Sequence, residues 1–315
     1  MSFVFVFPGQ GSQSVGMTAS LAATEPLVRA TFDEASQVLK YDLWKLVSEG
    51  PEAQLNATER TQPAMLTAGV ATWRVWRARG GGLPEVVAGH SLGEFTALVC
   101  AQALEFAAAV ELVRFRGEAM QAAVPAGAGA MAAILGLDDE IVIAVCAEVA
   151  QGAVVEAVNF NSPGQVVIAG ESSAVGRALE AARARGAKRV VMLPVSVPSH
   201  SSLMRAAGER LRERLQGLEV RAPAIRYVSA VDARTHEKAD EIREMLVRGL
   251  SNPVRWTDTL KVLTSGEAAQ VIECGPGKVL TGLNRRIERR EGLAFLALED
   301  PASVEAALKC VGGQK

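Results

Sequence analysis

The stretch Gly89-His90-Ser91-Leu92-Gly93 constrains the fold of this chain more than any other part of its sequence. It follows an apolar run at 86–88, typical of a short buried strand, and precedes residues 94–99, which predict the start of a helix. A strand, a G-x-S-x-G turn and a helix together form a nucleophile elbow. The glycines leave room where a Cβ would collide with the neighbouring elements, and the turn aims the first N–H groups of the helix above the serine. The sequence therefore predicts an activated serine, with an inert glycine-rich turn as the alternative.

A second polar stretch lies just past another strand. Residues 3–7 are continuously apolar and predict a buried, parallel strand, which Pro8-Gly9 closes. Gln10 follows on a glycine-rich loop, at the end of the strand where open α/β sheets bind ligands. We expect Gln10 to reach the same edge of the sheet as the elbow, although a simple turn is the other interpretation.

From residue 127 onward the pattern of strands and helices changes. It predicts strands at 130–136, 154–160, 165–169 and 189–197, and helices at 138–150 and 172–185. Residues 161–164, Asn-Ser-Pro-Gly, predict the turn of a hairpin between the two middle strands. This β-α-β-β-α-β order is that of a small ferredoxin-like domain.

Alternating strands and helices resume after this region. We therefore expect an α/β fold in which a large, α/β-hydrolase-like domain with a parallel sheet is formed by residues 1–126 and 198–315. The small ferredoxin-like domain, residues 127–197, is inserted into it. A length of 315 residues suits one large domain with such an insertion.

Composition excludes several classes of function. The net charge is −2, so there is no basic excess to neutralise a nucleic-acid backbone. The four cysteines lie far apart without C-x-x-C spacing, which argues against a metal site and favours a reducing, cytoplasmic location. The N-terminus lacks the charged region of a signal peptide, and no uncharged apolar run approaches the roughly 20 residues of a membrane helix. We see no dedicated apolar interface helix and expect a monomer without membrane partners.

A serine hydroxyl needs a general base at neutral pH, and histidine is the usual one. The chain has only His90, His200 and His236. His90 is the neighbour of the serine in the elbow and should point away from it, and His236 lies in a polar stretch that we expect to be solvated. His200 lies where the chain returns to the large domain, a natural cleft wall, and is the predicted base; a structural histidine at a turn is the alternative.

A catalytic triad would also need an acid, which in α/β-hydrolases lies between the serine and the histidine in chain order. Between Ser91 and His200 the only aspartates are Asp138 and Asp139, at a helix start in the small domain, and the glutamates lie mostly in helices. No candidate fits the role of the acid. We expect a backbone carbonyl to orient the imidazole, which leaves a serine–histidine dyad.

One arginine stands out on the helix predicted over about 104–124. Arg116 falls beside its apolar stripe, whereas Arg114 points elsewhere. An arginine at the edge of an apolar face needs an anionic partner or a route to solvent. Arg116 is therefore a candidate anion-binding residue, and a surface arginine is the competing interpretation.

Several motifs in order resemble one known family, the malonyl-CoA:acyl carrier protein transacylases of fatty acid and polyketide synthesis. The resemblance covers nearly the whole chain. The supporting stretches are Phe7-Pro8-Gly9-Gln10-Gly11-Ser12-Gln13, Gln62-Pro63-Ala64, Gly89-His90-Ser91-Leu92-Gly93-Glu94, Arg116-Gly117, Met120-Gln121, residues 159–165, Val197-Pro198-Ser199-His200, Asn252-Pro253-Val254 and Glu273-Cys274-Gly275-Pro276-Gly277.

The resemblance implies roles for the residues of the site. Ser91 would carry the acyl group, His200 would be the base, and Gln10 with the backbone N–H of Leu92 would form the oxyanion hole. Arg116 would pair with the free carboxylate of the malonyl group.

The same resemblance implies supporting roles in substrate binding. Gln62, Asn161 and His90 would belong to the substrate-binding part of the site. The carbonyl that orients His200 would come from the stretch after Asn-Pro-Val, at Arg255.

The activity so implied is malonyl transfer from malonyl-CoA to the phosphopantetheine thiol of acyl carrier protein, through a malonyl-serine and without a bound cofactor. A discrete polyketide-synthase acyltransferase shares these motifs. A serine hydrolase or thioesterase, and a non-catalytic docking module for the carrier protein, are further alternatives. Two basic groups are candidates for docking an acidic carrier protein, with ordinary solvated helix faces as the competing interpretation. They are Arg183, Arg185, Lys188 and Arg189, and Arg285, Arg286, Arg289 and Arg290.

Overall fold

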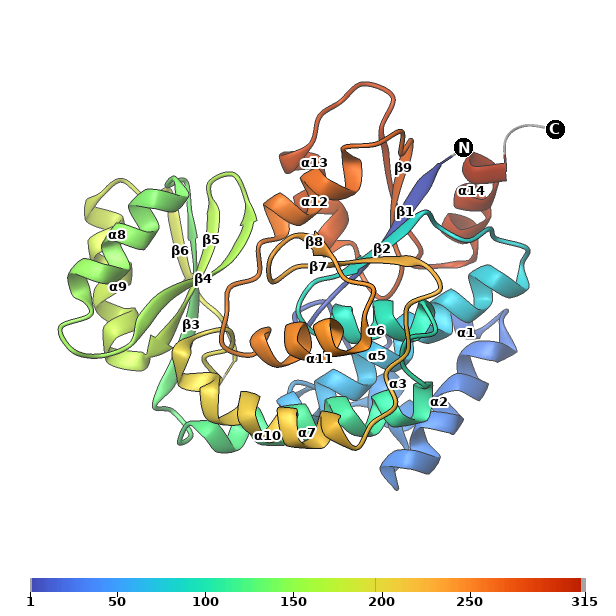
Figure 1. Cartoon of the computed structure of the whole chain (residues 1–315), viewed down its shortest axis with the longest axis horizontal. Coiled ribbons are helices and arrows are strands. Elements are labelled where there is room, and N and C mark those ends of the chain that lie inside the picture. Colours follow the sequence, from blue (N-terminus) through green and yellow to red (C-terminus); the bar gives the residue numbers. More distant parts are fainter. Residues whose placement is uncertain (1, 196, 313–315) are drawn as a thin grey trace.

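The computed structural model describes residues 2–195 and 197–312, which build two separate β-sheets with helices around them (Figure 1). One sheet has six strands and the other has four. The four-stranded sheet is formed by the middle of the chain and lies to one side of the molecule. The predicted α/β fold, a large parallel-sheet unit with an inserted ferredoxin-like unit, is confirmed.

The six-stranded sheet is parallel except at one edge. Its strands are β1 (Phe3–Phe7), β2 (Val86–Gly89), β7 (Arg226–Ser229), β8 (Arg234–Thr235), β9 (Gln270–Glu273) and β10 (Ala294–Ala297). Their order is β10-β9-β1-β2-β7-β8, and only β8 pairs antiparallel. Because β1 and β2 are neighbours, the loops that follow them meet at the same edge of the sheet.

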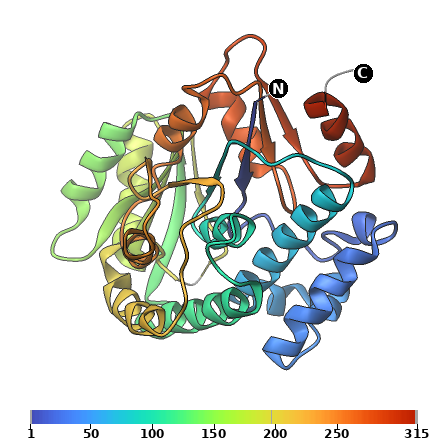
Figure 2. The same ribbon diagram turned by 45° about the vertical axis from the view of Figure 1, so that its right-hand side comes forward.

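Helices cover both faces of this sheet (Figure 2). The larger layer consists of α1 (Ala19–Ala22), α2 (Pro26–Leu39), α3 (Leu43–Glu49), α4 (Glu52–Leu55), α5 (Thr58–Ala78), α6 (Gly93–Cys100), α7 (Phe106–Ala123), α10 (Arg205–Gln216), α11 (Ala239–Arg248) and α14 (Pro301–Gly312). On the opposite face lie α12 (Trp256–Thr264) and α13 (Val279–Ile287). Strand β1 explains the arrangement: Phe3, Phe5 and Phe7 pack into one core while Val4 and Val6 pack into the other, as the period of two of a strand requires.

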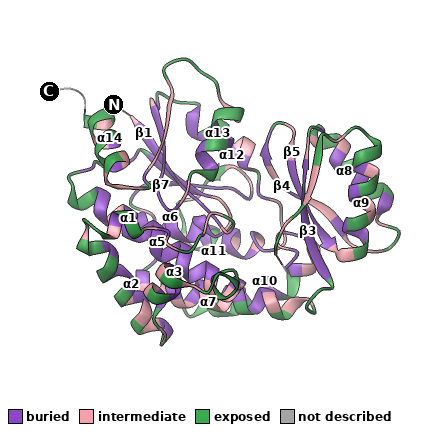
Figure 3. Ribbon diagram, turned by 180° about the vertical axis from the view of Figure 1, so that it is seen from behind, coloured by how far each residue is buried: buried purple, intermediate pink, exposed green. Residues whose placement is uncertain are grey.

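The four-stranded sheet is antiparallel and has helices on one face only. It contains β3 (Gly129–Leu135), β4 (Val155–Ser162), β5 (Gln165–Glu171) and β6 (Arg189–Met192), with α8 (Asp139–Val149) and α9 (Ser172–Ala184) packed on it. Its order, β4-β5-β3-β6, is that of the ferredoxin-like fold predicted from the sequence. Figure 3 shows the buried strands inside and the exposed outer sides of both helices.

Two details differ from the sequence-based expectation. Asn161 and Ser162 belong to strand β4, so only Pro163 and Gly164 form the turn, and the positive φ of 71° at Gly164 meets the demand of a tight turn. The strand predicted over 189–197 ends at Met192, and residue 196 lies outside the described part of the chain. The predicted domain limits, 1–126 with 198–315 and 127–197, stay a prediction.

The edge strand β4 is hydrogen-bonded to the segment around Val254, which belongs to the part of the molecule built on the six-stranded sheet. The Phe160 N–H donates to the Val254 carbonyl and the Val254 N–H to the Val158 carbonyl, both at 2.9 Å. Thr257 Oγ1 adds a bond to the Phe160 carbonyl at 3.2 Å. These bonds fix the helix-free face of the four-stranded sheet next to the edge of the six-stranded one. Among the described helices, none combines the length and apolar character needed to cross a membrane.

Candidate active site

The nucleophile elbow has the geometry that the sequence predicts. Strand β2 ends at Gly89, helix α6 begins at Gly93, and between them Ser91 has a left-handed φ of 54°. A Cβ on Gly89 would lie 1.9 Å from the Gly93 carbonyl carbon, and one on Gly93 would lie 2.1 Å from the Phe7 carbonyl oxygen. Only glycine fits either place, so the two glycines hold Ser91 on its strained turn.

Ser91 opens into a cavity of about 170 Å³ between the two sheets. Seven of the eight residues predicted for the site line it: Gln10, His90, Ser91, Leu92, Arg116, Asn161 and His200. An apolar part of the cavity wall comes from the helix-free face of the four-stranded sheet and from the segment that follows β6. Its members are Met131, Val167, Leu193 and Val195.

Arg116 is a buried cation beside the serine. Its Nη2 lies 3.4 Å from Ser91 Oγ, its guanidinium lies 5.5 Å from the centre of the Phe95 ring, and only 3% of the residue is exposed. Burial lowers the pKa of Arg116 to about 10, and the nearby Glu94 charge opposes this shift. Its Nε is buried without a hydrogen-bond partner, and within residues 2–195 and 197–312 it forms no ion pair. The expectation of a surface arginine is therefore excluded.

Gln62 lies behind Arg116 and not in the cavity wall. Its Oε1 accepts a hydrogen bond from Arg116 Nη1 at 2.8 Å, and its Nε2 lies 3.4 Å from Met120 Sδ. Helices α5 and α7 approach closely here, because a Cβ on Gly117 would lie 2.6 Å from the Cα of Glu59. The part of Gln62 in substrate binding stays a prediction; its side chain bonds to the guanidinium of Arg116 and does not line the cavity.

His200 also has a left-handed backbone, with φ 68°. Its Nδ1 lies 2.7 Å from the Gly249 carbonyl oxygen, so Nδ1 carries the proton and Nε2 is left to accept one. Burial, and after it the nearby Arg116 charge, lowers the pKa of His200 to about 3. The imidazole is thus neutral at physiological pH, which a general base requires.

The prediction that the carbonyl of Arg255 orients His200 is wrong. Arg255 is the N-cap of α12, and its carbonyl accepts bonds from the N–H and Oγ1 of Thr259. The carbonyl that fulfils the role belongs to Gly249, which follows the last residue of α11. Sequence could predict a carbonyl partner but not which distant loop would deliver it.

His90 and Asn161 are hydrogen-bonded to each other in the wall of the cavity. His90 Nε2 lies 2.8 Å from Asn161 Oδ1, and the His90 ring lies 5.5 Å from that of Trp256. Burial lowers the pKa of His90, which keeps the ring neutral. This hydrogen bond joins the elbow to strand β4 of the other sheet.

Gln10 and Leu92 both line the cavity into which Ser91 opens. Gln10 follows β1, and a Cβ on the preceding Gly9 would lie 2.4 Å from the His90 carbonyl oxygen, so the two loops touch. Leu92 is the N-cap of α6, and its backbone N–H makes no hydrogen bond within the described residues. A free N–H at a helix N-terminus is suited to hold a developing negative charge.

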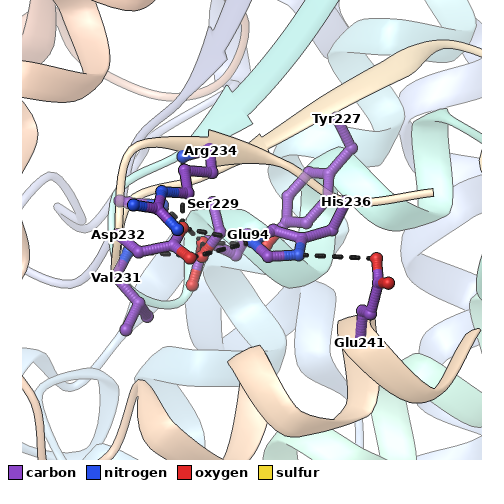
Figure 4. Close-up of polar contacts among 9 residues, drawn as sticks. Glu94, Tyr227, Ser229, Val231, Asp232, Arg234, His236 and Glu241 are labelled. Atoms are coloured by element: carbon purple, nitrogen blue, oxygen red, sulfur yellow. Dashed lines mark hydrogen bonds and ion pairs between the residues drawn. The ribbon is translucent and has the colours of Figure 1, made fainter. Parts of the chain in front are cut away.

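Glu94 was quoted in the sequence motif without a role, and the structure shows what it does. It lies in the first turn of α6, and its Oε1 accepts bonds from Tyr227 Oη, Ser229 Oγ and the Ala230 N–H, each at 2.8 Å (Figure 4). Burial raises the pKa of this carboxyl group. The network locks the helix of the elbow to strand β7; the only signal in the sequence was a charged residue inside an apolar helix.

His236 is not solvated, contrary to the expectation. Its side chain is 11% exposed, and its Nε2 lies 3.1 Å from both carboxylate oxygens of Asp232 while Glu241 lies 3.8 Å from Nδ1 (Figure 4). It does not line the cavity. His236 is a structural residue, so the choice of His200 as candidate base does not change. No cluster of three or more His, Cys, Asp or Glu side chains suited to a metal ion is found among the described residues.

A neutral histidine, a strained serine and a buried arginine line one cavity at the edge of an α/β sheet, an arrangement suited to acyl-group transfer. The family model of the acyl transferase domain matches residues 4–293. The malonyl CoA-acyl carrier protein transacylase of Salmonella typhimurium is 54% identical over 306 residues, which cover 97% of this chain and 98% of the relative. The chain belongs to the malonyl CoA-acyl carrier protein transacylase family.

Solved structures agree with this assignment. A chain in the structure of a type II PKS acyl-carrier protein in complex with its malonyl-transacylase is 53% identical, with a TM-score of 0.96 over 98% of this chain and all of that one. An acyl carrier protein S-malonyltransferase from Vibrio cholerae is 52% identical, with a TM-score of 0.94 and the same coverage.

Proposed function

We propose that this enzyme transfers the malonyl group of malonyl-CoA to the phosphopantetheine thiol of an acyl carrier protein, in fatty acid biosynthesis, through a malonyl-serine at Ser91. The observation that carries the proposal is the buried Arg116 guanidinium, 3.4 Å from Ser91 Oγ and without an ion pair among the described residues. A desolvated cation beside the nucleophile favours a substrate with its own carboxylate.

The first half-reaction forms the acyl-enzyme. His200 Nε2 takes the hydroxyl proton while Ser91 Oγ attacks the thioester carbonyl carbon. The Leu92 N–H and the Gln10 side chain donate hydrogen bonds to the oxyanion, a contribution of about 3–4 kcal/mol for each good donor. The C–S bond then breaks, and the protonated imidazole returns its proton to the departing coenzyme A sulfur.

The second half-reaction runs the same steps in reverse. The thiol of the carrier protein gives its proton to His200 Nε2, and its sulfur attacks the acyl-serine carbonyl. Collapse of the tetrahedral intermediate breaks the C–O bond, and Ser91 regains its proton. A single base and a single oxyanion site thus serve both halves, which predicts ping-pong kinetics.

The remaining site residues serve selectivity. Arg116 binds the malonyl carboxylate through two N–H groups, and Gln62 holds the guanidinium in the orientation that this requires. An acetyl group would leave the buried cation unpaired, so it should be a poor substrate. The bonded pair of His90 and Asn161 closes the cavity on the side of β4.

The proposal includes the partners and the setting. Malonyl-CoA is a substrate, the carrier protein supplies the phosphopantetheine, no bound cofactor takes part, and the enzyme acts in the cytoplasm as a monomer. Several of the candidate docking cations already have other bonds: Arg185 pairs with Glu148, Arg286 donates to Gln165 Oε1, and Arg290 donates to backbone carbonyls. Charge reversal at each of the basic residues, with the KM for the carrier protein as the measurement, tests which of them contact it.

A discrete polyketide acyltransferase is the second candidate, favoured by the 53% identity to the malonyl-transacylase bound to a type II PKS acyl-carrier protein. The test offers malonyl-CoA with fatty-acid and polyketide carrier proteins, and measures malonyl-carrier product and free malonate. Fast transfer to a fatty-acid carrier with little malonate supports the proposal. Preference for the polyketide carrier favours the second candidate, and malonate as the main product would show a hydrolase.

A further inference from the structure

The segment that carries His200 is under backbone strain, so something must hold it in place. A non-glycine residue with a φ of 68° costs on the order of 1–3 kcal/mol unless its surroundings impose it. From one side, the end of α11 supplies two bonds: the His200 N–H donates to the Leu250 carbonyl at 2.9 Å, and Nδ1 to that of Gly249 at 2.7 Å. These bonds hold His200 itself, and in the residue that follows it Ser201 Oγ donates to the Pro198 carbonyl at 2.7 Å.

The second anchor comes from the other sheet. The carboxylate of Glu156, in strand β4, accepts the Ser202 N–H at 2.7 Å through Oε2 and the Ser202 hydroxyl at 2.8 Å through Oε1. Ser202 lies two residues after His200 and begins the single 3₁₀ turn Ser202–Met204. One carboxylate thus binds two donors on the segment that follows the base, and such charge-assisted bonds are roughly twice as strong as neutral ones.

Glu156 is placed for this contact by the alternation of its strand. Val158 packs in the apolar cluster on the helix-free face of the four-stranded sheet, and Glu156, two residues earlier, shares that face. The carboxylate therefore points toward the cavity side of the molecule, where the chain returns from β6. Strand β4 is itself fixed to the larger unit through Val254.

We propose that Glu156 is a positioning residue which, through Ser202, holds the His200 segment in its strained conformation and so aims Nε2 at the serine. The inference rests on the proposed role of His200 as the base. It makes strand β4 of the small sheet part of the support for the base, although no residue of that sheet takes or gives the proton.

Removal of the Glu156 carboxylate should disturb the orientation of His200 without weakening the binding of malonyl-CoA. Removing the carboxylate leaves the Ser202 donors to water, and the φ of His200 can relax toward the allowed region. A displacement of the base of about 1 Å can cost on the order of a hundredfold in rate. Arg116 and Gln62 are untouched, so the KM for malonyl-CoA should not change.

The test compares E156A, E156Q and S202A with the control T257V, which removes another bond to β4 without touching the His200 segment. We expect single-turnover formation of the acyl-enzyme to fall about ten- to a hundredfold in E156A with KM unchanged. E156Q keeps one acceptor oxygen and S202A keeps the N–H donor, so both should lie in between, and T257V should match the parent.

A spectroscopic readout separates positioning from folding. The chain has only three histidines, so the proton on His200 Nδ1 can be followed by NMR and identified with H200A. In E156A we expect this signal to shift or broaden, while the signals of His90 and His236 stay unchanged.

Two outcomes would overturn the inference. Parent-like acylation in E156A, with or without a lower melting temperature, would make Glu156 a purely structural tie. If E156A fails to fold, parent-like rates in both E156Q and S202A would have the same meaning. An active H200A variant would instead refute the proposed base itself, whatever the result at Glu156.

Discussion

The two residues proposed to do the chemistry reach the same backbone conformation by different routes. Ser91 has a φ of 54° and His200 a φ of 68°. The strain at Ser91 is imposed largely by its own neighbours, because Gly89 lies against the start of α6 four residues later, while Gly93 packs against Phe7 of β1. The strain at His200 is imposed from afar, by Gly249, Leu250 and Glu156. A nucleophile can thus be encoded locally, whereas its base depends on the assembled fold.

The constraint that sequence neighbours place on Ser91 should be lost most completely when Gly89 is replaced. G89A places a Cβ 1.9 Å from the Gly93 carbonyl carbon, so the elbow cannot form and we expect no soluble, folded enzyme. Circular dichroism and thermal unfolding measure this. The matched control is G176A on α9, where an added Cβ meets nothing within 4 Å and the fold should persist. Normal folding and acylation in G89A would contradict the account.

Removal of the His200 side chain should slow the reaction while the fold stays intact. H200A removes the base, and the rate of acyl-enzyme formation should fall about 10²–10⁴-fold. Stopped-flow single turnovers with malonyl-CoA measure it. H236A is the control, because His236 lies outside the cavity and should leave this rate unchanged. A similar loss in both variants would point to a general effect on the fold.

A third prediction concerns Arg116, the residue proposed to bind the carboxylate of the substrate. R116A removes the charge-assisted bonds to the carboxylate, each worth about 1.5–3 kcal/mol, so malonyl transfer should fall at least about tenfold to a hundredfold. Acetyl transfer should hardly change. R114A, on the same helix but paired with Glu118, is the control. Equal losses for the two acyl groups would remove the proposed carboxylate clamp.

The smallest expected effect is that of pH. Burial lowers the pKa of His200 to about 3 from its usual value of 6.5, so the base stays neutral in mildly acidic solution. The kcat/KM for malonyl-CoA should therefore stay level between about pH 8 and about pH 5. The unfolded chain binds a proton to this histidine near pH 6.5 and the folded one does not, so stability falls as the pH drops below 6.5. A half-maximal rate near pH 6.5 would contradict the assigned environment.

The features that could be predicted from the sequence are mostly those that depend on residues close together in the chain. The elbow, the position of Arg116 beside an apolar stripe and the ferredoxin-like order of strands and helices each depend on neighbours within a few residues, and the structure agrees with them. His200 was chosen from only three histidines and lies in the cavity with Ser91, and its role as the base stays a prediction.

Two expectations about the histidines failed: the partner of His200 is distant in sequence, whereas the partners of His236 are near. The carbonyl that orients His200 was expected at Arg255 but belongs to Gly249, and His236 was expected to be solvated although it pairs with Asp232 and Glu241. Glu94 received no role, because its donors come from strand β7 and the loop after it, more than a hundred residues away. Such contacts exist only once the sheets have assembled.

The central claim is that Ser91 carries the malonyl group. Intact-mass spectrometry after brief exposure of the enzyme to malonyl-CoA, followed by peptide mapping, tests it directly. We expect one malonyl adduct, located on the peptide that contains Ser91, and no adduct in S91A. A stable adduct of the same mass in S91A, or its location on another residue of the parent enzyme, would contradict the account.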